Sequence, residues 1–319
     1  MRAPRSGAQS VYLPPMQLGF VTAILPDLPF RQVVDHAAEL GYDCLEVMCW
    51  PAGEGAKRRY AGVVHLDVAR PARELRDELD YARERGIGVS ALGYYPNPLD
   101  PDRAAARAAV EHLERLIDAA AELGVGTVTA FVGRDRTRTI EAQWDDFLAT
   151  WRPLVARAEA AGVRVGIENC PMRFTADEWP GGNNLAVGPA VWERMWADLP
   201  YAGFGLNYDP SHLVLMHMDE SLPLRDYPGR LVHVHAKDLR IDRAARDRHG
   251  VWAHPKLWHT PKLPGLGDVD WGRFFGHLTD AGYAGAVCVE VEDRAYEHSL
   301  ARRLASLRQS RAYLQQYFS

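Results

Sequence analysis

Short apolar segments alternate with amphipathic segments along the whole chain, and this pattern predicts strands that alternate with helices. In residues 72–85, for example, Leu75, Leu79 and Ala82 recur at the spacing of one helix face. The predicted strands are 17–22, 44–49, 87–92, 127–132, 163–168, 204–209, 231–238 and 286–290. The predicted helices are 30–40, 72–85, 104–123, 141–161, 189–198, 222–227, 271–281 and 296–318.

Glycine marks the ends of most of these predicted helices. A helix, a glycine, a few further residues and an apolar strand follow one another at Gly41, Gly86, Gly124, Gly162 and Gly282. Strict alternation predicts parallel strands with right-handed crossovers, and eight such units predict an α/β fold, a single closed (β/α)8 TIM barrel. An open doubly wound sheet is the alternative. That fold usually has a glycine-rich loop after its first strand, whereas residues 22–29 contain no glycine.

The barrel domain is expected to span residues 16–319. Residues 1–15 lack the apolar core of a signal peptide, so we expect a flexible N-terminal lead-in. Two loops are unusually long, 170–189 after the fifth strand and 239–270 after the seventh. Loops longer than about 15 residues are usually functional lids or disordered segments. The aromatic and histidine content of these two loops favours a lid or a subunit contact.

Composition narrows the function classes. The 319 residues carry a net charge of −5, which argues against binding to nucleic-acid backbones. No run approaches the roughly 18 apolar residues of a membrane span. The four cysteines form no C-x-x-C pair, which argues against a disulfide framework and favours a reducing compartment. We therefore expect a cytoplasmic protein with neither a nucleic-acid nor a membrane partner.

Metal-competent side chains lie where four successive predicted strands end: Glu168, Asp209, His235 and Glu290. A barrel gathers the carboxyl ends of its strands at one face, so these residues should converge. Three carboxylates and one imidazole suit a hard divalent ion, and we expect Mn²⁺, with Mg²⁺ or Co²⁺ as alternatives. Each residue alone has an ordinary explanation. A strand-end glutamate is often solvated, Asp209 is a good helix cap, and His233 shares a strand face with His235.

Such a site has a definite chemistry. A divalent ion can polarise a carbonyl group, and a carboxylate held beside it can remove a proton from the neighbouring carbon. The residues therefore favour proton transfer next to a carbonyl.

Five motifs carry a resemblance to a known superfamily. They are Gly166-Ile-Glu-Asn, Asn207-Tyr-Asp-Pro-Ser-His-Leu, His233-Val-His-Ala-Lys-Asp, Gly265-Leu-Gly-Asp-Val-Asp-Trp and Val289-Glu-Val-Glu-Asp. In their order and spacing, the chain resembles the xylose-isomerase-like TIM barrels from Gln17 to about Phe318. This superfamily includes sugar isomerases and 3-epimerases, inosose dehydratases and endonuclease IV relatives.

The resemblance implies roles for single residues. Glu168, Asp209, His235 and Glu290 match the metal ligands, and the two glutamates also match the pair that exchanges the substrate proton. Glu292 shares a strand face with Glu290 but does not match the motif position.

Other residues are predicted to contact the substrate. His212 matches a ligand of a substrate hydroxyl, and Lys237 is expected to contact a substrate oxygen, with a surface ion pair to Asp238 as its alternative. Tyr95, His65 and Trp50 are expected near the mouth of the barrel, where aromatic rings suit a sugar face or simply pack. His254 and His259 belong to the long seventh loop and are further candidates for substrate contacts.

The leading hypothesis is a metal-dependent sugar or keto-sugar isomerase or epimerase that works through a metal-bound enediolate. The runner-up is a lyase or dehydratase acting on a keto-sugar, a keto-glycoside or an inosose, with His65, His254 or His259 as general acid. Ile167 weakens its C-glycoside-cleaving form, since relatives of that kind place a histidine directly before the first metal glutamate.

Two further hypotheses have less support from the sequence. A nuclease of abasic DNA would need more metal-binding residues on the first four strands. A non-catalytic subunit would not need the intact ligand set. The resemblance also implies a homo-oligomer, a dimer or a tetramer.

Overall fold

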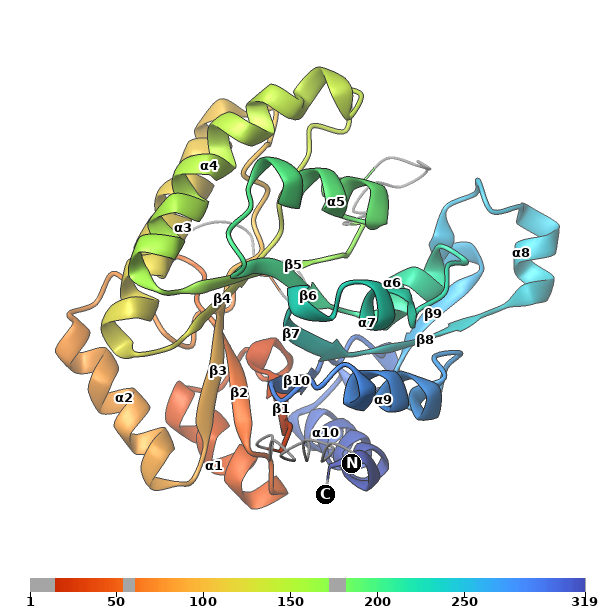
Figure 1. Cartoon of the computed structure of the whole chain (residues 1–319). Coiled ribbons are helices and arrows are strands. Elements are labelled where there is room, and N and C mark those ends of the chain that lie inside the picture. Colours follow the sequence, from red (N-terminus) through yellow and green to blue (C-terminus); the bar gives the residue numbers. More distant parts are fainter. Residues whose placement is uncertain (1–14, 54–60, 172–181, 319) are drawn as a thin grey trace, which may run out of the picture.

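A closed barrel of eight parallel strands forms the centre of the molecule (Figure 1). The computed structural model describes residues 15–53, 61–171 and 182–318. Around the barrel the strands follow the order β1, β10, β7, β6, β5, β4, β3, β2 and back to β1. They are β1 Gln17–Val21, β2 Cys44–Met48, β3 Gly88–Gly93, β4 Thr127–Ala130, β5 Arg164–Glu168, β6 Phe204–Tyr208, β7 Leu231–Ala236 and β10 Ala286–Val289. The predicted TIM barrel is confirmed.

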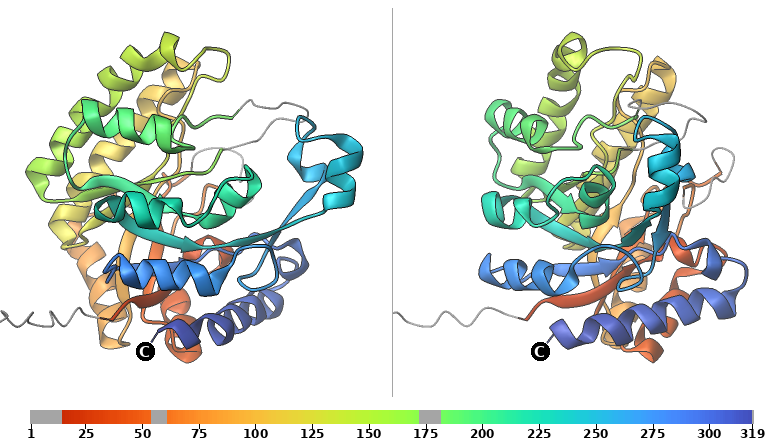
Figure 2. Two further views of the ribbon diagram at one scale, coloured as in Figure 1. Left: turned by 45° about the vertical axis from the view of Figure 1, so that its right-hand side comes forward. Right: turned by 90° about the vertical axis from the view of Figure 1, so that its right-hand side faces the viewer.

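Helices cover the outside of the barrel, as the views in Figures 1 and 2 show. Left-handed glycines end three of them, with φ of 77° at Gly41, 71° at Gly124 and 67° at Gly162, as the sequence pattern predicts. Apart from α8, which is described below, the α-helices are α1 Phe30–Leu40, α2 Ala72–Glu84, α3 Arg103–Leu123, α4 Trp144–Ala161, α5 Pro189–Asp198, α6 Pro210–Leu215, α7 Leu222–Asp226, α9 Trp271–Asp280 and α10 Leu300–Leu314.

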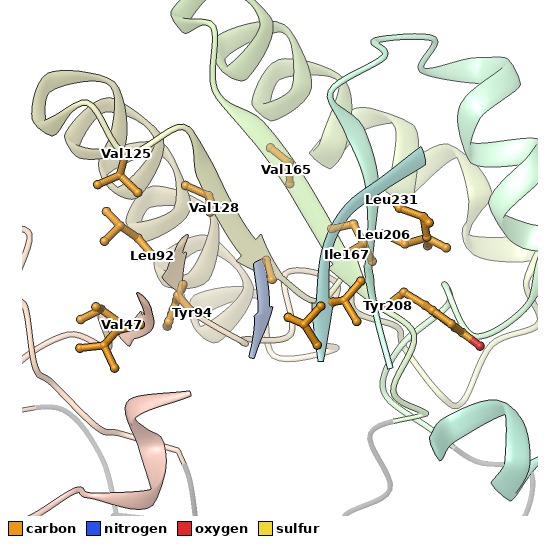
Figure 3. Close-up of a cluster of buried hydrophobic side chains, with 14 of the residues drawn as sticks. Val47, Leu92, Tyr94, Val125, Val128, Val165, Ile167, Leu206, Tyr208 and Leu231 are labelled. Carbon is orange, nitrogen blue, oxygen red and sulfur yellow. The ribbon is translucent and has the colours of Figure 1, made fainter. Parts of the chain in front are cut away.

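Alternation along each strand separates an outer apolar layer from the interior of the barrel. On β2, Leu45 and Val47 belong to the large cluster that packs with the helices, whereas Cys44 and Met48 belong to a separate smaller cluster. Figure 3 shows part of the large cluster, with Val128 and other strand residues beside the helices. The other strand face is therefore available for polar side chains, and Glu46 lies between the two smaller-cluster positions.

The segment after β7 differs from its prediction. Residues 239–270 are not one long loop, because they contain most of an antiparallel pair, β8 Asp238–Ile241 and β9 His259–Lys262. Helix α8 Arg243–His249 lies between them, and the segment projects from the barrel at the right of Figure 1. Two four-residue strands of mostly polar residues carry too little periodicity to be recognised. Short helix α6 is not among the predicted helices, but the alternative of Asp209 as a helix cap is what the structure shows, since its side chain accepts a hydrogen bond from the Ser211 N–H.

Two other predicted features lie at least partly outside the described residues. Residues 1–14 of the lead-in are outside, as are residues 172–181 of the loop after the fifth strand.

Asp238 organises the return from the β8–β9 segment to the barrel. Its buried carboxylate accepts hydrogen bonds from the backbone N–H groups of Gly265, Gly267 and Val269 and from the indole of Trp271, at 2.9–3.1 Å. A Cβ atom at Gly267 would lie 2.2 Å from this carboxylate, so the position accepts only glycine. Asp238 therefore belongs to the scaffold of the motif that begins at Gly265.

Replacing this carboxylate should weaken the fold more than an ordinary helix cap does. Asp238→Ala leaves several buried donors without partners, and we expect the free energy of unfolding to fall by about 3 kcal/mol. The control is Asp242→Ala, which removes an exposed cap of α8 and should cost about 1 kcal/mol. Urea denaturation measures both, and equal losses would show that Asp238 does not hold the segment.

Candidate metal and proton-transfer site

The four strand-end residues of the predicted ligand set converge at one end of the barrel. Glu168 is the last residue of β5, Asp209 follows β6, His235 lies on β7 and Glu290 follows β10. One ligand atom from each lies within 4.8 Å of the other three. Glu168, Asp209 and His235 are buried and Glu290 is partly exposed. The structure thus brings together the side chains that the sequence pattern singled out.

The donor atoms of this cluster suit a divalent cation. His235 Nδ1 is buried and has no hydrogen-bond partner among the described residues. It lies 3.7 Å from Glu168 Oε1 and 3.7 Å from Glu290 Oε2. Buried polar atoms almost always have a partner, and an imidazole nitrogen that faces carboxylate oxygens is a good metal ligand. These residues therefore fit a divalent cation.

Lys237 lies inside the carboxylate cluster. Its buried ammonium is 2.6 Å from Glu290 Oε2, 2.9 Å from Asp209 Oδ2 and 3.4 Å from Glu292 Oε2. Burial lowers the pKa of Lys237, but these carboxylates outweigh it and raise that pKa well above its ordinary value. The alternative ion pair with Asp238 is not what the structure shows, because Asp238 is bonded to the loop described above. Lys237 compensates part of the negative charge of the site.

His212, on α6, lies beside the same groups. Its Nε2 is 3.2 Å from Glu168 Oε1, 3.1 Å from Asp209 Oδ2 and 3.2 Å from Lys237 Nζ. Asp209 begins α6 by accepting a hydrogen bond from the Ser211 N–H. One turn of helix thereby brings His212 back over the carboxylates. His212 and Lys237 therefore lie side by side, and their contacts with a substrate stay predictions.

The two glutamates have different acidities. Burial raises the pKa of Glu168, but His212, His235 and Lys237 outweigh it and bring the pKa down to about 2. Burial also raises the pKa of Glu290, and the nearby charge of Glu168 raises it further. Together these two effects outweigh the lowering by Lys237, and the pKa of Glu290 is about 7. Two nearby carboxylates with separated pKa values are the usual arrangement for acid and base roles.

Glu46 is a site residue that sequence reasoning missed. It lies in the middle of β2, is fully buried, and its Oε2 is 2.6 Å from His235 Nε2. Burial raises its pKa, but His235 and His233 outweigh it and lower the pKa to about 2. In turn, carboxylates including Glu46 and Glu290 outweigh the effect of burial and raise the pKa of His235 well above its ordinary value. The available signal was a charge within the apolar strand Cys44-Leu-Glu-Val-Met.

The structure also separates the two histidines of β7. His233 Nδ1 lies 3.0 Å from Asn207 Oδ1, and its Nε2 lies 3.1 Å from Ser90 Oγ. Both nitrogens of His233 therefore have partners deeper in the barrel, whereas Nδ1 of His235 has no hydrogen-bond partner in the part of the chain that the structure describes. This difference, which strand alternation could not supply, favours His235 as the ligand.

The other predicted substrate contacts are more scattered. Tyr95 bonds through its hydroxyl to Glu46, so it belongs to the edge of the site. Trp50 packs edge-on against Tyr94 with ring centroids 4.9 Å apart. His65 bonds to Thr22 Oγ1 and to the Leu25 carbonyl, and burial lowers its pKa to about 4. Both ring nitrogens of His65 therefore contact the segment that follows β1, which is a structural role.

His254 and His259 lie in the β8–β9 segment. His254 accepts a hydrogen bond from the Lys256 N–H, and His259 Nδ1 lies 2.6 Å from the Pro255 carbonyl. These contacts are local to that segment. The substrate or general-acid roles of both histidines stay predictions.

Removing the ammonium should destabilise the metal-free protein. Lys237→Met leaves buried carboxylates uncompensated, and we expect the free energy of unfolding to fall by about 3–5 kcal/mol. Divalent cations should restore more stability to this variant than to the parent, because they supply the missing charge. Chemical denaturation with and without Mn²⁺ measures both effects.

The control is Lys262→Met, which breaks the ion pair with Asp293 away from the cluster. It should show no extra gain from Mn²⁺ over the parent. A Lys237→Met protein as stable as the parent without metal would contradict the role given to Lys237.

No helix in residues 15–53, 61–171 and 182–318 is long and apolar enough to cross a membrane.

Comparisons with known proteins agree with this architecture. YfiH of Bacillus subtilis (strain 168) is 29% identical over 313 residues, covering 87% of this chain and 93% of YfiH. An inosose dehydratase of Clostridium tetani (strain Massachusetts / E88) is 31% identical over 113 residues, which cover 35% of this chain and 37% of the dehydratase. Crystalline D-psicose 3-epimerase in the presence of D-fructose superposes with a TM-score of 0.69 at 17% identity, covering 95% of this chain and 99% of the epimerase. The family model described as xylose isomerase-like TIM barrel matches residues 34–317, and the chain belongs to that family.

Proposed function

We propose that this protein is a divalent-metal-dependent isomerase or epimerase of a sugar or keto-sugar, with Mn²⁺ as the preferred ion. The observation that carries the proposal is the convergence of two glutamates on one ligand cluster. Glu168 Oε1 and Glu290 Oε2 each lie 3.7 Å from the same nitrogen of His235. Two carboxylates from separate strands can then reach one substrate carbon from different sides.

In this proposal one glutamate removes a proton from the carbon beside the substrate carbonyl, and the other returns a proton to it. Return to the opposite face of that carbon inverts it and gives the epimer. Return to the former carbonyl carbon gives the isomer, provided that the hydroxyl proton of the first carbon moves to the former carbonyl oxygen. Glu168, Asp209, His235 and Glu290 would hold the metal, which when bound supplies a Lewis acid for the carbonyl oxygen. His212 and Lys237 donate hydrogen bonds to substrate oxygens. Burial of the cluster keeps water from the carbanionic carbon.

Solvent exchange tests this directly. Protein supplied with Mn²⁺ in D₂O should place deuterium on the carbon next to the carbonyl of D-fructose, D-psicose or a related ketose, as read by NMR and mass spectrometry. Glu168→Gln and Glu290→Gln should each slow the exchange by about 10³-fold or more, because each removes a group that transfers the proton.

The matched control is Glu292→Gln, which alters the neighbouring carboxylate on the same segment. Glu292 contacts Lys237 but lies outside the ligand cluster, so we expect this variant to slow the exchange less than tenfold. Absence of exchange with every ketose and keto-sugar tried would remove the proposal, as would equal losses in all three variants.

The second candidate function is a lyase, and the similarity to inosose dehydratases motivates it. Elimination begins with the same proton removal but then expels a hydroxyl group from the adjacent carbon with the help of an acid. Lys237 and His212 lie beside the glutamates, and in this second proposal one of them would protonate that leaving group. The test is to incubate the protein with an inosose or a keto-sugar and to follow the ultraviolet absorbance of a conjugated carbonyl product. Formation of that product without an epimer would favour the lyase over the isomerase.

Three further expectations belong with this proposal. We propose that residues 16–319 act as one catalytic domain on a small-molecule substrate. We propose a cytoplasmic location, which suits four free cysteines. We also propose a homo-oligomer, a dimer or a tetramer, which gel filtration with light scattering would measure.

A further inference from the structure

Glu46 is the buried carboxylate of β2, and it contacts the candidate ligand His235 on the side of the ring that faces away from the other ligands. Its Oε2 lies 2.6 Å from Nε2, the ring nitrogen opposite the one that faces Glu168 and Glu290. Neither Glu46 nor His235 has any exposed surface. A 2.6 Å hydrogen bond between a buried carboxylate and this ring nitrogen fixes the orientation of the ring.

The other oxygen of Glu46 is fixed as well. Thr129 Oγ1 donates to Oε1 at 2.7 Å, and the Tyr95 hydroxyl donates to the same atom. A Cβ atom at Gly93 would lie 2.9 Å from Oε1, so the missing side chain there makes room for the carboxylate. Residues on or after β3 and β4 therefore hold Glu46, and Glu46 in turn holds His235.

This arrangement determines which nitrogen of His235 keeps a proton. A carboxylate only accepts hydrogen bonds, so Nε2 carries the hydrogen that Glu46 receives. Asn207 Nδ2 also lies 3.0 Å from Nε2, but it donates to the Tyr95 hydroxyl at 2.9 Å. The nitrogen left to bind a cation is then Nδ1, the buried atom that has no partner within the described residues.

We propose that Glu46 is a positioning residue that keeps the proton of His235 on Nε2 and so presents Nδ1 to a divalent cation. This inference rests on the metal site of the proposed function. Carboxylates that orient a ligand histidine in this way typically change metal affinity by 10- to 100-fold when they are replaced.

The near-isosteric change Glu46→Gln gives a sharp test. The donors Thr129 and Tyr95 both face Oε1, so the amide oxygen of the glutamine takes that side and its NH₂ group faces Nε2. An NH₂ group donates to Nε2, which moves the ring proton to Nδ1, the position that the cation needs. We therefore expect Zn²⁺, used as the probe, to bind about 10- to 100-fold more weakly in a chelator competition.

The matched control is Glu220→Gln. Glu220 is also buried and pairs with Arg273 at 2.6 Å, but it lies outside the ligand cluster. The Glu220→Gln variant should bind Zn²⁺ with the same affinity as the parent. A folded Glu46→Gln protein that binds Zn²⁺ within about twofold of the parent would overturn the inference, while the proposed function would stand.

A second measurement needs no variant. In the Zn²⁺-loaded parent labelled with ¹⁵N-histidine, His235 should show zinc at Nδ1 and a low-field proton on Nε2 that is hydrogen-bonded to Glu46. Zinc at Nε2, or a ring without that proton, would overturn the role of Glu46. A parent that binds no divalent cation would instead remove the metal site, and with it both the proposed function and this inference.

Discussion

Compensation of buried negative charge is the constraint on which the rest of this structure depends. Glu168, Asp209 and Glu290 converge at one end of the barrel, and Glu46 adds a fourth carboxylate in the middle of β2, where it contacts His235. Buried ions of one sign cannot remain without partners, since the cost of removing each from water is several kcal/mol. Lys237 and the imidazoles supply part of the balance. A divalent cation suits such a site because it adds two charges without adding another side chain.

The barrel makes this concentration of charge possible. Parallel strands deliver their carboxyl ends to one face, and alternation leaves the outer face of each strand apolar. The outer residues shown in Figure 3 pack with the helices, so the strands stay fixed while their inner faces carry polar groups. Stability is therefore supplied mainly by one face of each strand and chemistry by the other. Asp238 extends this scheme by anchoring the chain that leads back from the β8–β9 segment.

The sequence predicts the barrel well and the site in part, for physical reasons that differ between residues. Glu168, Asp209 and Glu290 are recognisable because a charge directly after an apolar strand has a definite place in a barrel. Glu46 is different, since a charge in the middle of a strand acquires a meaning only when its partner, 189 residues away, is known. The short pair β8 and β9 escapes notice because its few residues carry no clear period.

The halves of the barrel contribute to the site in different ways. The four candidate ligands come from β5, β6, β7 and β10 or from the residues that follow them. The first half supplies Glu46 and the donors that fix it, and Glu46 contacts the cluster through His235. The ligand motifs therefore predict the kind of chemistry, whereas the geometry of the cluster also depends on side chains from strands that carry no motif. Two chains could share every motif residue and still bind metal differently, because the carboxylate that orients His235 comes from the first half of the barrel, which carries none of these motifs.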